Sequence, residues 1–453
     1  MNSTGTPNLF ARAASLLLGQ QPTDTDDRDA RLLLQALDYA SAEVQEAGGE
    51  PALEARHRAC LLQAASRFKR IFELVAPDAP GLVSFGAELD PALADPLHAG
   101  SHLVGVSGVG VSLQDAFQGC VGEGIEYLSQ LQIGDDLLEP AGPGDAGLGP
   151  RTQEFLYAYS RHRLRPAAEL SWCRALRLAD GREVLLPADL CLRRAPGARE
   201  IDPPFPLSTG SAAGKTWEAA ALHGLLELIE RDAASLWWRG GHPGRSIPPG
   251  DETQLTAETL LEKLRQNAPG RRSWLLDITT DIGVPCVASV SCLADGFGFA
   301  VGLAAKPTLK AAARSAILEM CQGELAHAVV EAKLRERGET ALNERDRAHR
   351  RRATMINVDQ CLLLQPGPGR AQHLTLDSTD AGTVLRLIVN RLAQFGFDSF
   401  GLDLTRPRFA TPVARVIAPG LQLEPSAIVS PRLADMIART GGGAVYTGGV
   451  SLI

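Results

Sequence analysis

The stretch that decides the fold is residues 208–233, which read STGSAAGKTWEAAALHGLLELIERDA. Thr216 is a favoured N-cap residue and helix-forming residues follow it, so the sequence predicts a helix that begins there. Glu227 and Glu230 stand three residues apart and project from one face of that helix, about three turns from its start. The stretch therefore predicts a helix that presents a pair of carboxylates.

The same spacing occurs three times in the chain. When Glu123, Glu227 and Glu319 are aligned, a hydroxyl residue stands eleven positions before each glutamate and an alanine stands seven positions before it. The aligned glutamates are separated by 104 and 92 residues, so each repeat is a domain-scale unit. The hydroxyl residues are Ser112, Thr216 and Thr308, the alanines are Ala116, Ala220 and Ala312, and the residues three positions after the glutamates are Glu126, Glu230 and Gln322.

Strand signals alternate with long helical stretches over most of the chain, which predicts an α/β (α+β) fold of repeated strand–helix units. Residues 1–75 show helical periodicity without strand signals and are predicted to form a helical N-terminal region of unknown role. Residues 76–453 are predicted to form the domain that carries the repeat. The predicted strands are Leu103–Val106, Arg182–Leu186, Val284–Ser291, Phe299–Leu303, Ser399–Leu404 and Val413–Val416.

The composition excludes several classes of protein. The chain has 453 residues, of which 45% are hydrophobic and 22% charged, as in globular proteins, and its net charge of -8 gives no general attraction to nucleic acid or to anionic membranes. The eight cysteines form no C-x-x-C pair, so neither a zinc site nor a compact disulfide framework is indicated. The N-terminal segment fails as a signal peptide and as a membrane span, and we expect a cytoplasmic protein.

The two carboxylate pairs lie among apolar and glycine residues, where ionised glutamates are costly to bury unless they are paired or bind a metal. Four carboxylates without histidine ligands favour a hard cation, and Mg²⁺ normally binds together with phosphate oxygens. The pairs therefore predict a site for Mg²⁺ and a nucleotide such as ATP. A two-metal hydrolase is the competing use of the same ligands.

Two glycine-rich stretches, Gly105–Gly110 and Ser208–Thr216, precede the first two helices and are expected to receive phosphate at the helix N-termini. The second stretch is not a Walker A loop, because three residues separate Gly210 from Gly214 where that loop has four.

Three further side chains are candidates for the nucleotide site. Arg231 could contact phosphate or pair with the glutamates, and the phosphate role is favoured. Lys215 at the helix start could also contact phosphate or remain solvated. His223 lies one turn before Glu227 on the same face, so it either reaches the site or is a core histidine. The run of arginines and acidic residues in 331–352 is interpreted as a solvated helix face.

Residues 208–233 closely resemble the signature of YcaO-type enzymes. Other stretches resemble the same family in the expected order, from about residue 80 to the C-terminus. They are Gly122–Glu126, Glu319–Gln322, Asp403–Pro407, Pro412–Arg415 and Pro419–Leu421.

This resemblance implies a YcaO-like ATP- and Mg²⁺-binding catalytic domain that modifies the backbone of ribosomally made precursor peptides. Similar enzymes are cyclodehydratases that form azolines from Cys, Ser or Thr. The resemblance also implies a separate E1-like partner that binds the leader peptide, allows for a flavin dehydrogenase in the same complex, and leaves a homodimer open. By the same resemblance, Glu123, Glu126, Glu227 and Glu230 hold Mg²⁺, while Arg231, Glu319 and Gln322 occupy nucleotide-site positions, beside the candidates Lys215 and His223.

The sequence departs from the family pattern at Val109, Gly119, Tyr127 and Ala219, where many relatives have lysine, serine, arginine and glutamate. The final residues also lack the proline-rich tail of many azoline-forming members. Thioamide or amidine formation, and a nucleotide-binding scaffold subunit without turnover, therefore remain alternatives.

Overall fold

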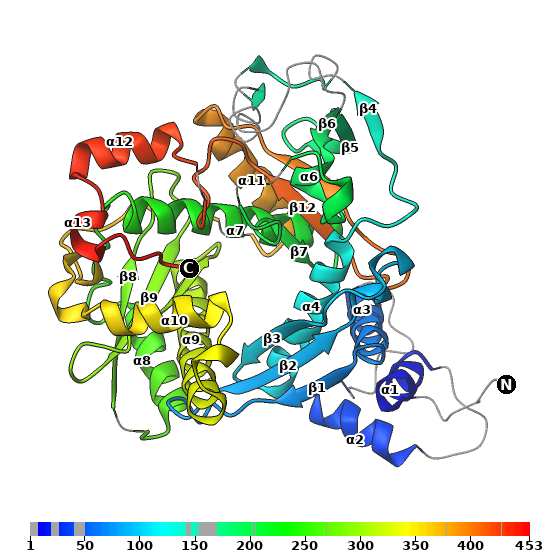
Figure 1. Cartoon of the computed structure of the whole chain (residues 1–453), viewed down its shortest axis with the longest axis horizontal. Coiled ribbons are helices and arrows are strands. Elements are labelled where there is room, and N and C mark those ends of the chain that lie inside the picture. Colours follow the sequence, from blue (N-terminus) through cyan, green and yellow to red (C-terminus); the bar gives the residue numbers. More distant parts are fainter. Residues whose placement is uncertain are drawn as a thin grey trace.

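The computed structural model describes residues 8–19, 27–39, 50–141, 146–150, 152–153, 170–201, 203, 205–268, 270–376, 378–426 and 428–453. The chain begins with α1 (Leu9–Leu17), α2 (Arg28–Ala36) and α3 (Glu50–Ala65), which lie at one corner of the molecule in Figure 1. One strand, β1 (Arg70–Glu73), lies within the region expected to be helical throughout. Strand β1 is short and mostly exposed, so its sequence lacks the alternation of apolar and polar residues that marks a strand. It is recognised in the structure by its antiparallel pairing with β2 (Val83–Leu89). The assignment of residues 1–75 to a separate domain remains a prediction.

The strands form three antiparallel sheets. The first has the order β1-β2-β3 and the second β10-β9-β8, while the third has the order β4-β5-β11-β12-β7 with β6 paired to β5. Each of the six predicted strand stretches overlaps a strand of the structure, so the mixed α/β prediction is confirmed. The remaining strands are β3 (Val104–Gly110), β4 (Glu139–Ala141), β5 (Leu170–Arg177), β6 (Glu183–Pro187), β7 (Ser211–Ala213), β8 (Arg271–Asp277), β9 (Cys286–Leu293), β10 (Ala300–Ala305), β11 (Phe400–Asp403) and β12 (Val413–Ile417).

In each repeat a strand of a different sheet leads into one long helix. Strand β3 is followed by α4 (Leu113–Gln130), β7 by α7 (Trp217–Trp238) and β10 by α9 (Leu309–Arg337). The three helices start as predicted, because the side chains of their N-cap residues accept hydrogen bonds from backbone N–H groups three residues on. These residues are Ser112, Thr216 and Thr308.

Small residues let each long helix lie close to its neighbours. The three aligned alanines are fully buried, each with 0% of its surface exposed. In β3, a Cβ on Gly108 would overlap the backbone of α4 at Ala116 and Cys120. In β10, a Cβ on Gly302 would overlap the backbone of α9 at Ala316 and Met320. Close packing of helix on strand therefore fixes where the helix side chains lie relative to the strand.

Other helices pack against this framework: α8 and α10 contact α9, and α12 lies beside α7 (Figure 1). None of the helices that the structure describes is long and apolar enough to cross a membrane. The α-helices not yet introduced are α6 (Ala188–Cys191), α8 (Glu252–Arg265), α10 (Glu344–Met355), α11 (Ala381–Gln394), α12 (Pro431–Thr440) and α13 (Ala444–Thr447), and short 3-10 turns accompany them.

Candidate functional site

The aligned glutamate of each repeat binds a backbone N–H group at or just before the strand of its own unit. Glu123 accepts from Ser107 N at 2.9 Å and Glu319 accepts from Leu303 N at 3.0 Å. Glu227 accepts from Gly210 N at 3.0 Å. The three equivalent contacts show that the repeat seen in the sequence is also a repeat in three dimensions.

The residue three positions later binds the strand of a different unit. Glu126 of α4 accepts from Ala213 N in β7 at 2.8 Å, and Glu230 of α7 accepts from Ala305 N in β10 at 3.3 Å. Gln322 of α9 donates from Nε2 to Ser107 Oγ in β3 at 2.9 Å. Unit one therefore contacts unit two, unit two contacts unit three, and unit three returns to unit one. The long helices close a ring around one centre.

Five carboxylates meet at this centre and repel one another. Burial, together with the charge of neighbouring carboxylates, raises the pKa of Glu126 to about 8 and that of Glu230 to about 8. Burial also raises the pKa of Glu123 and Glu319. Glu123 nonetheless keeps an exposed face. These carboxyl groups therefore retain protons more readily than a free glutamate, and a bound cation would favour their ionised form.

Arg231 is the closest cation to these carboxylates. Its guanidinium lies 3.5 Å from Glu227 and 3.3 Å from Glu230. Burial opposes the charge of Arg231, but the attraction of Glu230, Glu227 and Glu319 outweighs burial and raises its pKa. The structure therefore shows Arg231 paired with the glutamates, one of the two alternatives that the sequence left open. A guanidinium at this place can also bind phosphate oxygens.

Two cations at the centre were not recognised in the sequence. Lys306 directly follows β10, and its charge acts on both Glu230 and Glu319. Arg345 of α10 acts on Glu123, although its segment was interpreted as a solvated face. A lysine just before the Thr308 N-cap is a signal that could have identified Lys306. Nothing local distinguishes Arg345 from its neighbours, because the folding of α10 against α9 brings it here.

The two other basic candidates, His223 and Lys215, have contacts outside the five carboxylates of the ring. The His223 ring is 3.4 Å from the carbonyl oxygen of Ala213. Crowding by protein and the charge of Lys306 lower the pKa of His223 to about 4, so the ring is neutral at pH 7. Lys215 forms an ion pair with Glu54 of α3, and this pair ties the start of α7 to the N-terminal helices. Nucleotide contacts by both residues remain predictions.

The first glycine-rich stretch, Gly105–Gly110, lies in β3, is hydrogen-bonded to β2 and leads into the N-terminus of α4. Phosphate binding at that N-terminus remains a prediction. The glycine at Gly108 allows α4 to pack on the strand. In this way the stretch positions Glu123.

The donors at the centre fit Mg²⁺. They are carboxylate and amide oxygens, the hard donors that Mg²⁺ prefers. In the part of the chain that the structure describes, no group of three or more His, Cys, Asp or Glu side chains is arranged to hold a metal ion. In proteins Mg²⁺ usually takes one or two carboxylates together with phosphate oxygens and water.

Sequence comparison identifies the family. Residues 107–422 match the YcaO cyclodehydratase family, which is described as binding ATP and Mg²⁺. An uncharacterised protein of Methanothermobacter thermautotrophicus is 29% identical over 269 residues, covering 56% of this chain and 66% of that protein. An uncharacterised protein from the tfuA 3′ region of Rhizobium leguminosarum bv. trifolii is 29% identical over 281 residues, covering 56% of this chain and 61% of that protein. The aligned part of the chain thus spans less than two thirds of either relative.

Solved structures share the fold. A heterocyclase in complex with substrate and cofactor has a TM-score of 0.64 and 23% identity, covering 82% of this chain and 52% of its own. YcaO from Methanopyrus kandleri, bound with AMPPCP and Mg²⁺, has a TM-score of 0.54 and 19% identity, covering 81% and 89%. The E. coli microcin synthetase McbBCD complex with pro-MccB17 has a TM-score of 0.57 and 14% identity, covering 77% and 87%.

The family match covers most of the chain, and the family's cofactors suit the ring of carboxylates around Arg231. This chain belongs to the YcaO family, whose members bind ATP and Mg²⁺.

Proposed function

We propose that this chain is an ATP-dependent cyclodehydratase of ribosomally made precursor peptides and forms azolines from Cys, Ser or Thr. The observation that carries the proposal is the ring of five crowded carboxylates, which the repeated backbone contacts hold in place. In this reaction a side-chain thiol or hydroxyl of the peptide adds to the preceding amide carbonyl. The resulting oxyanion takes the γ-phosphoryl group of ATP, and phosphate then leaves as the C=N bond forms.

Each side chain has a distinct part in this proposal. Glu123, Glu126, Glu227 and Glu230 hold Mg²⁺, which supplies charge neutralisation at the phosphates. The backbone N–H groups keep the carboxylates oriented before ligands arrive, so little reorganisation is needed. Arg231 exchanges part of its contact with Glu227 and Glu230 for phosphate oxygens. Glu319 and Gln322 complete the nucleotide side of the ring.

The proposed partners are a precursor peptide and an E1-like protein that binds its leader, with a flavin dehydrogenase as a further member of the complex. The chain incubated with precursor, E1-like partner and Mg²⁺-ATP is expected to lose one water from the peptide for each ring formed, as measured by mass spectrometry. An unchanged peptide mass with folded, partner-bound protein would refute the proposal. Exchange of one oxygen for sulfur would instead establish the thioamide alternative.

Glu227→Gln separates the metal role from folding. It removes the ligand charge and keeps the volume, so precursor-dependent phosphate release is expected to fall at least about 100-fold. Glu218→Gln is the matched control, because Glu218 lies exposed in the first turn of the same helix. Phosphate release also tests the scaffold alternative, in which ATP binds to the wild-type chain and none is hydrolysed.

A further inference from the structure

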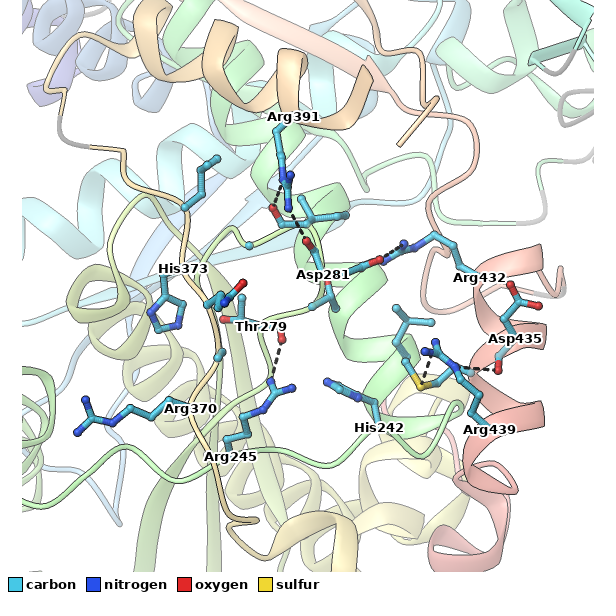
Figure 2. A pocket seen from close by; sticks show the side chains of 18 of the residues that line it. His242, Arg245, Thr279, Asp281, Arg370, His373, Arg391, Arg432, Asp435 and Arg439 are labelled. Atoms are coloured by element: carbon cyan, nitrogen blue, oxygen red, sulfur yellow. Dashed lines mark hydrogen bonds and ion pairs between the residues drawn. The ribbon is translucent and has the colours of Figure 1, made fainter. Parts of the chain in front are cut away.

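A cavity of about 890 Å³ lies apart from the ring of carboxylates. Its wall comes from the end of α7, the loop after β8, the segment 370–374, α11 and α12 (Figure 2). None of the five carboxylates of the ring lines it. Its volume falls within the range of about 300–1,000 Å³ typical of ligand sites.

The cavity wall is rich in arginine. Arg432 is neutralised by Asp232 at 2.9 Å and by Asp281 at 2.7 Å. For the other four, the described part of the chain offers no carboxylate within ion-pair distance, although Asp435 also lines the wall. They are Arg245, Arg370, Arg391 and Arg439.

Backbone carbonyls orient three of these guanidinium groups without neutralising them. Arg245 donates to Thr279 O at 3.2 Å and Arg439 donates to Asp435 O at 3.3 Å. Arg391 donates to Ile282 O at 3.0 Å and to Asp281 O at 2.9 Å. The arginine charges also act on His242. Its pKa is lowered by burial and further by the charges of Arg245 and Arg439. An anion in the cavity would meet positive charge that is already in place.

The arrangement of these charges favours an extended anion. Figure 2 shows Arg391 on one side of the cavity, Arg439 on another, and Arg245 with Arg370 on a third. Leu236, Ile282 and Met436 provide apolar surface between them. A single phosphate needs donors that converge on one point, whereas a peptide that alternates acidic and apolar side chains matches separated cations and apolar wall.

Helix α7 carries residues of both the carboxylate ring and the cavity wall. Leu236 follows Glu230 by six residues, or about 9 Å along the helix axis. An extended peptide covers about 3.3 Å per residue, so a few residues match this axial separation.

We propose that this arginine-lined cavity binds an acidic segment of the peptide substrate and so holds the substrate at a second point, away from the reacting amide. The proposal rests on the proposed function, because it assumes a peptide substrate. It assigns the cavity a recognition role and leaves the chemistry to the carboxylate ring.

The test uses a fluorescein-labelled peptide of alternating Glu and Leu, with a Gln/Leu peptide of equal length as its control. Fluorescence anisotropy with the full chain, without ATP, should show binding of the Glu/Leu peptide only, weakened by added salt. Arg370→Gln/Arg439→Gln should weaken this binding about tenfold or more, since charges on the rim set electrostatic attraction. Both side chains are exposed, so the fold should survive.

Arg335→Gln/Arg347→Gln removes the same charge from exposed sites on α9 and α10 and should bind the peptide like the wild type. Equal binding by both double variants would overturn the proposal, as would binding of tripolyphosphate at the arginines without binding of the acidic peptide. The Glu227→Gln variant should bind the probe normally while losing turnover. A failed proposed function would appear as absent turnover of precursor, independently of probe binding.

Discussion

Gln322 on the last long helix donates from Nε2 to Ser107 Oγ on the first repeated strand, at 2.9 Å. The two residues are 215 positions apart in the chain. In the other two units a carboxylate reaches a backbone N–H in the equivalent way, so this contact closes the ring with a neutral amide. The ring therefore has one uncharged junction, and that junction joins the first and third repeats.

We expect Ser107→Ala and Gln322→Ala each to destabilise the protein by about 1 kcal/mol, because each leaves a partly buried polar group without its partner. The double variant should lose less than the sum of the two. Urea unfolding measures all three. Strictly additive losses would mean that the two side chains do not interact in solution.

Replacing Arg231 should disable the site even where the fold survives. Arg231→Gln leaves Glu227, Glu230 and Glu319 without their closest cation and is expected to lower ATP turnover on the order of 100-fold. Arg231→Lys should restore little, because an ammonium group cannot bridge two carboxylates as a planar guanidinium does. Steady-state phosphate release is the measurement. Near-normal turnover in the lysine variant would show that charge alone suffices.

Gly108→Ala tests the packing that positions Glu123. Its Cβ would overlap the α4 backbone at Cys120 and Ala116, so we expect a loss of about 1–3 kcal/mol or more. Gly105→Ala, in the same strand, is the control, because a Cβ there meets nothing within 4 Å. Thermal unfolding compares them. Similar melting temperatures for the two variants would contradict the close approach of α4 to β3.

We expect His327 to make the free energy of unfolding fall as the pH is lowered. Burial and the neighbouring His349, Arg271 and Arg352 lower its pKa from 6.5 to about 3, so below pH 6.5 the unfolded chain binds a proton that the folded chain does not. The stability contributed by the neutral ring is present above pH 6.5 and is lost by about 1.4 kcal/mol per pH unit as the pH falls toward 3. His327→Leu should reduce that loss.

Urea unfolding of wild type and His327→Leu at several pH values between 7 and about 4 measures the difference. The two free energies of unfolding should approach each other as the pH falls. Parallel curves would show that His327 is protonated in the folded protein.

The local features of the repeat were predictable from the sequence. The N-caps, the buried alanines and the helix-borne glutamate pairs depend on residues a few positions apart, and the structure contains each of them. The exposed edge strand β1 was missed because it has no periodicity of its own. The close packing of α4 on Gly108 was also missed, because sequence alone does not show which glycine a distant helix will approach.

The three similar strand–helix units, and the paired carboxylates on two of them, follow from the amino-acid pattern alone. Three features depend on the tertiary packing: the strand that each i+3 residue reaches, the action of Lys306 and Arg345 on the carboxylates, and the gathering of five arginines in one cavity. The reason is physical. Capping and helix-face geometry act over a few residues, whereas the contacts between units depend on packing that joins residues 75 to 215 positions apart.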